Sequence, residues 1–433
     1  VGSGRLERMD TPAPASRDQQ RIAVIGAGPS GLAAAWSLGR FDRYVVDVWT
    51  GSVGSPTIAE DDAADLSVGM IPVVSAWWRA LGIEATTQSL TIAPPDPLTL
   101  KGLRRWRLGS RALRHTPMSL DKSLELQRSG DLVGEFLTGL VAATTGFGSE
   151  PGDVPLALAL EILDRLACDP FDGETIRLPV LLGARRILGE LRAHPEIPDA
   201  MPRSAARVTP HSSGLIVHDE RGRCDTYDRV VVATGPAELR RLIPDHALAQ
   251  ASPRTARILR LVAVPSTRRA AKLADPRLVW SRADDDLWSF EVRSGDVEQP
   301  DRVILGSTER LRAGVDVSIR PVRRPSPIPF ASGPTGASWR RAQGADGVVA
   351  TLGWALGHDI DTSVSAGLAV ADRLGAPWPF RANGEADRRF SAMFATLHGE
   401  HLRAWRRAVT VPHTEPDMDR PPAWTPDNPA TTR

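Results

Sequence analysis

Four short, mostly apolar runs along the chain indicate buried strands. They are Ile22 to Ile25, Tyr44 to Trp49, Val230 to Ala233 and Val348 to Leu352. Apolar runs of this length, bounded by turn residues, are typical of strands that are covered on both faces, as in a parallel sheet. The pattern therefore predicts an α/β protein with a parallel sheet at its centre.

The intervals between these runs carry helical or alternating periodicity. A helix is expected at Met70 to Leu81 with a stop at Gly82, and another at Ser363 to Leu374, where Gly375 can end it. Asp361 or Thr362 can cap this second helix. The remaining expectations are a mostly helical stretch from 120 to 191, a β-hairpin within 207–234, and β-rich sequence from 259 to 306.

A glycine turn joins the first two apolar runs. Gly26, Gly28 and Gly31 follow the first run at GxGxxG spacing, and the alanine-rich segment 32–38 comes next. In a βαβ unit the first glycine allows the turn, the second lets a diphosphate approach the backbone, and the third lets helix and strand pack closely. The phosphates lie at the helix N-terminus. Glycine turns are common, so a purely structural turn is the alternative, but the strand before and the helix after favour dinucleotide binding.

The end of the second strand departs from this pattern. A dinucleotide site places a carboxylate there, about twenty residues after the glycines, to hold the ribose hydroxyls. Thr50 occupies that position, and Asp47, three residues earlier, points to the opposite face by strand alternation. We therefore expect the ribose contact to be weaker, to come from elsewhere, or to be missing.

Length and composition restrict the class of protein. The chain has 433 residues, enough for two domains, and a formal net charge of +1, which argues against nucleic acid as a partner. Two cysteines, Cys168 and Cys224, are too few for a disulfide framework and have no metal-ligand spacing, so we expect a cytoplasmic protein without a metal site. No apolar run reaches the roughly 18 residues of a membrane span, and residues 1–20 are expected to be a flexible leader.

One segment is strongly basic. Residues 101–115 carry six lysine and arginine side chains, no acidic residue, and apolar residues between the charges. Such a helix can lie on a membrane surface or bind an acidic partner. A solvated arginine-rich face is the favoured interpretation, because only three of the 53 basic residues of this chain are lysine and arginine is used throughout.

The order of four sequence motifs resembles the FAD-dependent amine oxidase superfamily, which includes monoamine and polyamine oxidases, protoporphyrinogen oxidase and phytoene desaturases. Within it the chain is most similar to bacterial predicted NAD/FAD-binding flavoproteins. The motifs are RIAVIGAGPSGLAAAWSL, DLSVGMIPVVSAWWRALGIEATTQSLTI, YDRVVVATGPAELRRLIP and SVSAGLAVADRLGAPWPF. The resemblance covers roughly residues 20 to 380.

The resemblance implies a Rossmann-like FAD-binding domain, discontinuous in sequence, with an inserted α+β substrate domain. The FAD-binding domain would comprise 21–75, 205–245 and 345–380, and the substrate domain 76–204 and 246–344, with a C-terminal extension at 381–433 that is disordered at its end. The implied cofactor is FAD. Its implied contacts are Gly26, Gly28, Pro29, Ser30, Gly31, Thr50, Val208, Ala233, Thr234, Gly235, Gly353, Trp354, Asp361, Ser363 and Val364.

The resemblance also implies a function and three catalytic candidates. The activity would be oxidation of an amine, or desaturation of a small and mostly apolar metabolite, by hydride transfer to the flavin. Trp354 and His358 would lie beside the flavin, and Lys272 is the candidate for the lysine that many family oxidases hold near it. The alternatives are core packing for the tryptophan, a helix-capping loop for the histidine and a surface position for the lysine. Because Thr50 and Trp354 replace acidic residues of the family, a non-redox cyclase, isomerase or binding protein is the rival function.

Overall fold

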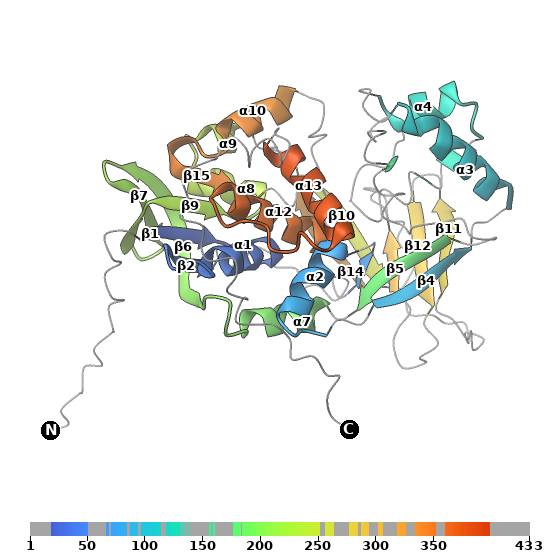
Figure 1. The fold of residues 1–433 in the computed structure, drawn as a ribbon. Coiled ribbons are helices and arrows are strands. Elements are labelled where there is room, and N and C mark those ends of the chain that lie inside the picture. The colour runs from blue at the N-terminus through green and yellow to red at the C-terminus, as the bar shows by residue number, and fades with distance from the viewer. Residues whose placement is uncertain are drawn as a thin grey trace, which may run out of the picture.

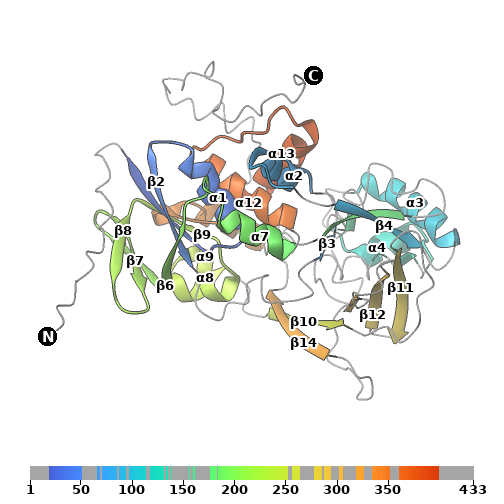
Figure 2. The same cartoon turned by 90° about the horizontal axis from the view of Figure 1, so that it is seen from below.

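The chain forms two sheets that lie side by side in both views of the molecule (Figures 1 and 2). The computed structural model describes residues 19–50, 66–68, 71–84, 87–93, 97–113, 118–130, 133–134, 137, 156, 159–160, 176–182, 184–251, 256–263, 277–284, 287–293, 302–305, 318–325, 334–351 and 360–398. One sheet has seven strands and the other has eight. The predicted α/β class with a parallel core is confirmed.

The seven-stranded sheet contains the four strands predicted from the apolar runs. Its first five strands pair in parallel and its last three pair in antiparallel fashion, with β6 belonging to both sets. In spatial order the strands are β15 (Val348–Ala350), β9 (Arg229–Val232), β1 (Gln20–Ile25), β2 (Tyr44–Thr50), β6 (Ala200–His211), β7 (Gly214–Asp219) and β8 (Cys224–Tyr227).

Strand β1 is buried on both faces, as its unbroken apolar sequence predicts. Ile22 and Val24 share one core cluster with residues of the helices that cover the sheet, whereas Ala23 and Ile25 belong to a second cluster that includes Val208 of β6. These four residues of β1 are fully buried. The central strand is therefore fixed from both sides, and its carboxyl end is held in place.

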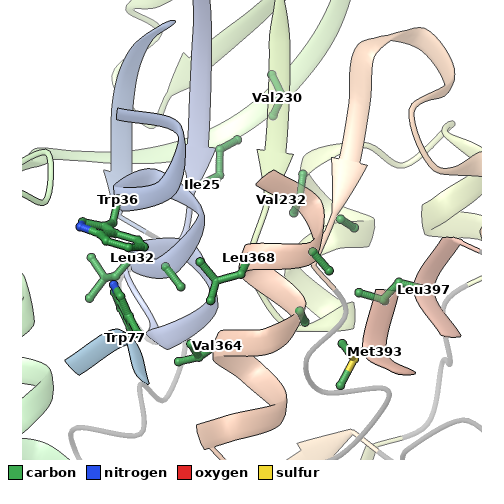
Figure 3. Close-up of a cluster of buried hydrophobic side chains, with 14 of the residues drawn as sticks. Ile25, Leu32, Trp36, Trp77, Val230, Val232, Val364, Leu368, Met393 and Leu397 are labelled. Carbon is green, nitrogen blue, oxygen red and sulfur yellow. The ribbon is translucent and has the colours of Figure 1, made fainter. Parts of the chain in front are cut away.

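Two helices from opposite ends of the sequence cross on this sheet. They are α1 (Pro29–Gly39) and α12 (Ile360–Arg373), which confirms the helix expected at 363–374. A Cβ placed on Gly367 of α12 would lie 2.0 Å from the carbonyl oxygen of Ser30, so the two backbones touch. Figure 3 shows Leu32 of α1 and Leu368 of α12 in the shared apolar cluster.

The predicted helix at 70–81 is α2 (Pro72–Ala80), and it packs near α13 (Gly384–His398) (Figure 1). Residues 381–433 were expected to be a C-terminal extension, but Phe390, Phe394 and Leu397 of α13 are fully buried. The ring of Phe390 stacks on Trp378 at a centroid distance of 4.2 Å. These apolar residues recur at helical spacing, but the charged residues between them lower the average hydrophobicity of the segment.

The eight-stranded sheet forms the second part of the molecule, together with α3 (Pro97–Arg111) and α4 (Leu120–Leu126). It includes four strands in the segment expected to be β-rich. In spatial order the strands are β14 (Ser318–Pro325), β10 (Ala256–Ala263), β13 (Arg302–Leu305), β12 (Leu287–Arg293), β11 (Arg277–Asp284), β4 (Thr87–Ala93), β5 (Ile176–Leu182) and β3 (Leu66–Val68).

Strand β5 corrects the expectation of a mostly helical stretch from 120 to 191. Its sequence, IRLPVLL, is a short apolar run, and such a run cannot be assigned to helix or strand by periodicity alone. Pairing with β4 and β3 decides the outcome. The short remaining elements are α7 (Ala184–Arg192), α8 (Pro236–Leu242), α9 (Ala247–Gln250), α10 (Pro334–Ala342) and the 3-10 helix η4 (Ala345–Gly347).

Elements cross two of the expected domain limits. Helix α2 runs through residue 75, and β6, which pairs with β2, runs through residue 205. Strand β3 lies before residue 75 and pairs in the eight-stranded sheet. The proposed limits therefore stay predictions. In the described part of the chain, no helix combines the length and apolar character needed to cross a bilayer.

Candidate functional site

The glycine turn between β1 and α1 is tightly built. Gly26 has a φ of +116°, and its N–H donates to the carbonyl oxygen of Trp49 at 2.8 Å. A Cβ on Gly26 would lie 2.7 Å from the carbonyl oxygen of Ala233, at the end of β9. Only glycine fits both the backbone conformation and the space. The turn is thereby fixed against the ends of the two neighbouring strands.

The other two glycines of the motif differ in their surroundings. A Cβ on Gly31 would lie 1.8 Å from the carbonyl oxygen of Gly26, so this glycine is required for helix and strand to pack. A Cβ on Gly28 would meet no atom within 4 Å. Gly28 is the N-cap of α1, its backbone is extended, and it offers no side chain to cap the helix. The turn is therefore closed at two glycines and open at the one where a diphosphate would approach.

The first turn of α1 borders this open space. Pro29 is at its first helical position and has no N–H, while the N–H groups that follow it have no partner within the helix. Ser30 lies 3.2 Å from the hydroxyl of Thr351, the residue that follows β15. Hydrogen-bond donors and a helix dipole thus converge at the carboxyl edge of the parallel strands, which is where open α/β sheets bind ligands.

The turn after β9 lies along the same edge. The N–H of Ala233 donates to the carbonyl oxygen of Ile25 at 2.8 Å, and Gly235 is an extended N-cap with open space at its Cβ position. The hydroxyl oxygen of Thr234 is buried and has no hydrogen-bond partner in the described part of the chain. Its methyl carbon lies close to Gly26. The structure therefore brings Ala233, Thr234 and Gly235 to the glycine turn.

An arginine that the sequence analysis did not single out contacts the same turn. Arg192, the last residue of α7, directs its Nε and Nη2 atoms to the carbonyl oxygen of Ala27 at 3.3 and 3.2 Å. Ala27 lies between the first two glycines of the motif. The spacing of 165 residues between the two partners leaves no local sequence signal that could have found this contact.

Thr50 stands at the carboxyl end of β2, and its hydroxyl is engaged by the protein. The hydroxyl donates to the carbonyl oxygen of Arg203 at 2.9 Å and lies 3.3 Å from the hydroxyl of Ser204. Asp47 instead forms a 2.7 Å ion pair with Arg21. The ribose position is thus lined by two neutral hydroxyl groups, and the nearby carboxylate is used elsewhere.

Arginine and aromatic side chains support the strand that ends at Thr50. The guanidinium of Arg203 lies 4.5 Å from the centre of the Trp49 ring and pairs with Asp225. The indole N–H of Trp49 donates to the hydroxyl of Tyr227 at 2.9 Å. Burial raises the pKa of the Tyr227 phenol well above its usual value, so this group stays protonated. These contacts make the end of β2, where the ribose contact was expected, an internally bonded surface.

The predicted contacts on α12 and β6 face the protein interior. The Oδ1 atom of Asp361 accepts hydrogen bonds from the N–H groups of Val73 and Val74, both at 3.0 Å, and the residue is 1% exposed. Its Oδ2 atom lies 3.5 Å from Nε of Arg389 on α13. Asp361 therefore caps the N-terminus of α2, although it lies far from α2 in the sequence.

The remaining predicted site residues divide into two groups. Val208 and Val364 are buried in the core (the latter in Figure 3), and Ser363 is half-buried. Gly353, Trp354, His358 and Lys272 lie outside the described residues. The described part of the site is therefore the edge formed by the two turns and the end of β2.

Comparison with known proteins relates this architecture to solved structures. A CLA-producing fatty acid isomerase from P. acnes matches with a TM-score of 0.60 and 12% identity over 83% of this chain and 99% of the isomerase. Putrescine oxidase bound to putrescine matches with a TM-score of 0.56 and 16% identity over 82% and 99% of the two chains. An oxidoreductase from Methanosarcina mazei matches with a TM-score of 0.53 and 12% identity over 81% and 100%.

No protein-family model matches the sequence, and no curated protein sequence matches it. The structural likeness is spread over four fifths of the chain, whereas the identity is low, so it establishes the fold. The fold that the resemblance in the sequence motifs implied is thereby confirmed.

Proposed function

We propose that the chain is a flavoprotein that binds FAD along the edge formed by the β1–α1 turn and uses it as an oxidoreductase. The observation that carries the proposal is the contrast between the three glycines: two are closed by backbone contacts, and Gly28 alone borders open space. A diphosphate needs such an opening beside helix N–H groups. The fold likeness to putrescine oxidase supports this function.

The residues present fit the diphosphate of FAD better than they fit the ribose of its ADP part. Gly28 and the first turn of α1 would hold the diphosphate, and the buried hydroxyl of Thr234 would gain a partner. Thr50 and Ser204 would accept hydrogen bonds from the ribose hydroxyls. Because neutral acceptors bind more weakly than a carboxylate, the ribose would contribute less than in a site with an acid there.

The flavin, when bound, supplies the redox chemistry by accepting a hydride from the substrate. We propose an amine or a small, mostly apolar metabolite as substrate, in line with the resemblance stated from the sequence. This part of the proposal places Trp354 and His358 beside the flavin and Lys272 as the nearby cation. The chain's own contribution would be to orient the substrate and exclude water.

A non-redox isomerase or a binding protein is the second candidate. The observation that favours it is at Thr50, whose hydroxyl already donates its hydrogen bond to the carbonyl oxygen of Arg203. A fatty acid isomerase is also among the proteins that share the fold. The two candidates differ in whether flavin is held tightly and reduced by a substrate.

An absorbance spectrum of the purified chain, before and after incubation with FAD, tests the proposal. We expect flavin bands near stoichiometric strength. Gly28→Val should remove them while the chain stays folded, since the new side chain fills the opening without meeting protein atoms at its Cβ. Gly130→Val is the matched control, because Gly130 is exposed and has equally open surroundings. Absence of flavin bands in the wild type after added FAD would contradict the proposal, and so would their persistence in Gly28→Val.

A further inference from the structure

Arg192 brings a positive charge to the glycine turn from a distant helix. Its guanidinium contacts Ala27 through two nitrogen atoms, and in the described part of the chain its side chain bonds no other residue. A guanidinium has five N–H donors in a planar fork. Two of them point to Ala27, and the others are available to an anion beside the turn.

The position of Arg192 is fixed by the packing of α7. Ile187, Leu188 and Leu191 of this helix are buried in the same core as α1. Just beyond it, the carboxylate of Glu196 accepts a hydrogen bond from the indole of Trp36 at 3.2 Å. Helix α7 lies beside α1 in Figure 2. The arginine is thus held at the turn by apolar burial and does not reach it from a loosely placed surface helix.

The contact also changes the electrostatics of the turn itself. The carbonyl oxygen of Ala27 carries partial negative charge one residue before Gly28, where a bound diphosphate would lie. Bonding by a guanidinium offsets that charge and adds a full positive charge. The planar fork of arginine matches phosphate oxygens better than an ammonium does. Residues 51–65, which follow β2 in the sequence, contain no lysine or arginine that could supply this charge instead.

We infer that Arg192 pairs with the diphosphate of the bound dinucleotide, and that this chain gains its affinity at the diphosphate end because the ribose end has lost its carboxylate at Thr50. The inference rests on the proposed function. It makes Arg192 a cofactor-binding residue, contributed by a helix outside the βαβ unit. It also predicts that phosphate charge matters more to binding than the ribose hydroxyls do.

Titrations of the purified full-length chain with FAD, ADP and adenosine test the inference, using flavin fluorescence or calorimetry. Arg192→Gln should weaken binding of FAD and ADP by about tenfold or more, because it removes a charge-assisted contact. Adenosine lacks phosphates, so its affinity should stay unchanged. Arg192→Lys should recover part of the loss. Arg79→Gln, at an exposed position on α2, is the matched control and should bind all three ligands like the wild type.

The outcomes separate the inference from the proposed function. If the wild type binds FAD and Arg192→Gln binds FAD and ADP equally well, the inference is wrong and the proposed function stands. If Arg192→Gln loses adenosine affinity to the same extent, the arginine only supports the turn, which also overturns the inference. If the wild type binds neither FAD nor ADP, the proposed function fails as well.

A measurement on the wild type guards against a variant that does not fold. Inorganic diphosphate should displace ADP, and added salt should weaken ADP binding far more than adenosine binding, because only the charged contact is screened. Equal salt dependence for the two ligands would contradict the role of Arg192.

Discussion

The glycine turn and the two polar positions predicted to serve the same cofactor differ in what their polar groups already contact. At the turn, Gly28 faces open space. Thr50 donates its proton to Arg203, and the carboxylate of Asp361 is bonded to two N–H groups of α2. The glycine turn is open at Gly28, whereas the polar groups of Thr50 and Asp361 already have partners within the protein. The position of a residue in a sequence motif therefore does not by itself decide its function, because the side chain there can bond to the protein instead of to a ligand.

The largest effect expected from this comparison separates two glycines of one motif. Gly31→Ala should lower the free energy of unfolding by more than about 4 kcal/mol, because its Cβ overlaps a backbone oxygen that cannot move away. Gly28→Ala should cost less than about 1 kcal/mol, as expected for an alanine at an N-cap. Denaturant unfolding measures both. Similar losses in the two variants would show that the turn is not open at Gly28.

The next effect tests whether Asp361 acts as a structural residue. Asp361→Ala should lower the free energy of unfolding by about 3 kcal/mol, because two buried N–H groups of α2 lose their acceptor and Arg389 loses one of its partners. Asp361→Asn keeps the acceptor and removes the charge, so its loss should be smaller. If Asp361→Ala is as stable as the wild type but binds FAD poorly, Asp361 is a cofactor contact after all.

The third effect concerns His398, a buried histidine at the end of α13, the helix that packs on α12. Burial, assisted by the positive charge of Arg373, lowers the pKa of His398 to about 3, although its Nε2 bonds the carbonyl of Ala369. Below its ordinary pKa of 6.5 the unfolded chain binds a proton that the folded chain does not, so stability falls as the pH drops from 6.5 toward 3.

Because of His398, the free energy of unfolding should be about 2 kcal/mol lower at pH 5 than at pH 7.5. Unfolding measured at both pH values checks this. Phenylalanine has a similar shape and cannot take up a proton. The free energy of unfolding of His398→Phe should therefore change by about 2 kcal/mol less between the two pH values than that of the wild type. Parallel pH dependences for the two proteins would mean that other groups cause the effect.

The smallest effect concerns the ribose end. Thr50→Glu should tighten FAD binding by about tenfold, since a carboxylate accepts ribose hydroxyls more strongly than a hydroxyl does. The same change leaves the carbonyl of Arg203 without its donor and should cost about 1 kcal/mol of stability. Thr50→Val should show the stability loss without the gain in affinity. Equal or weaker FAD binding by Thr50→Glu would mean that the site is built around threonine.

Local sterics explain which parts of the site could be predicted. The role of Gly31 follows from a contact within one strand–turn–helix unit, and the apolar runs of β1 and β9 could be recognised because both faces are covered. Arg192 and the partner of Asp361 could not be predicted, since each contact joins segments more than 150 residues apart. Helix α13 was missed because charges between its buried residues masked the periodicity.

The pairing of β1 has a consequence for synthesis of the chain. One neighbour, β2, follows it directly, but the other, β9, begins only at Arg229. At roughly 5–20 residues per second, a ribosome needs about 10–40 s to make the intervening sequence. Through that interval the apolar edge of β1 has no native partner, and it is the type of segment that chaperones shield and that aggregates when translation stalls.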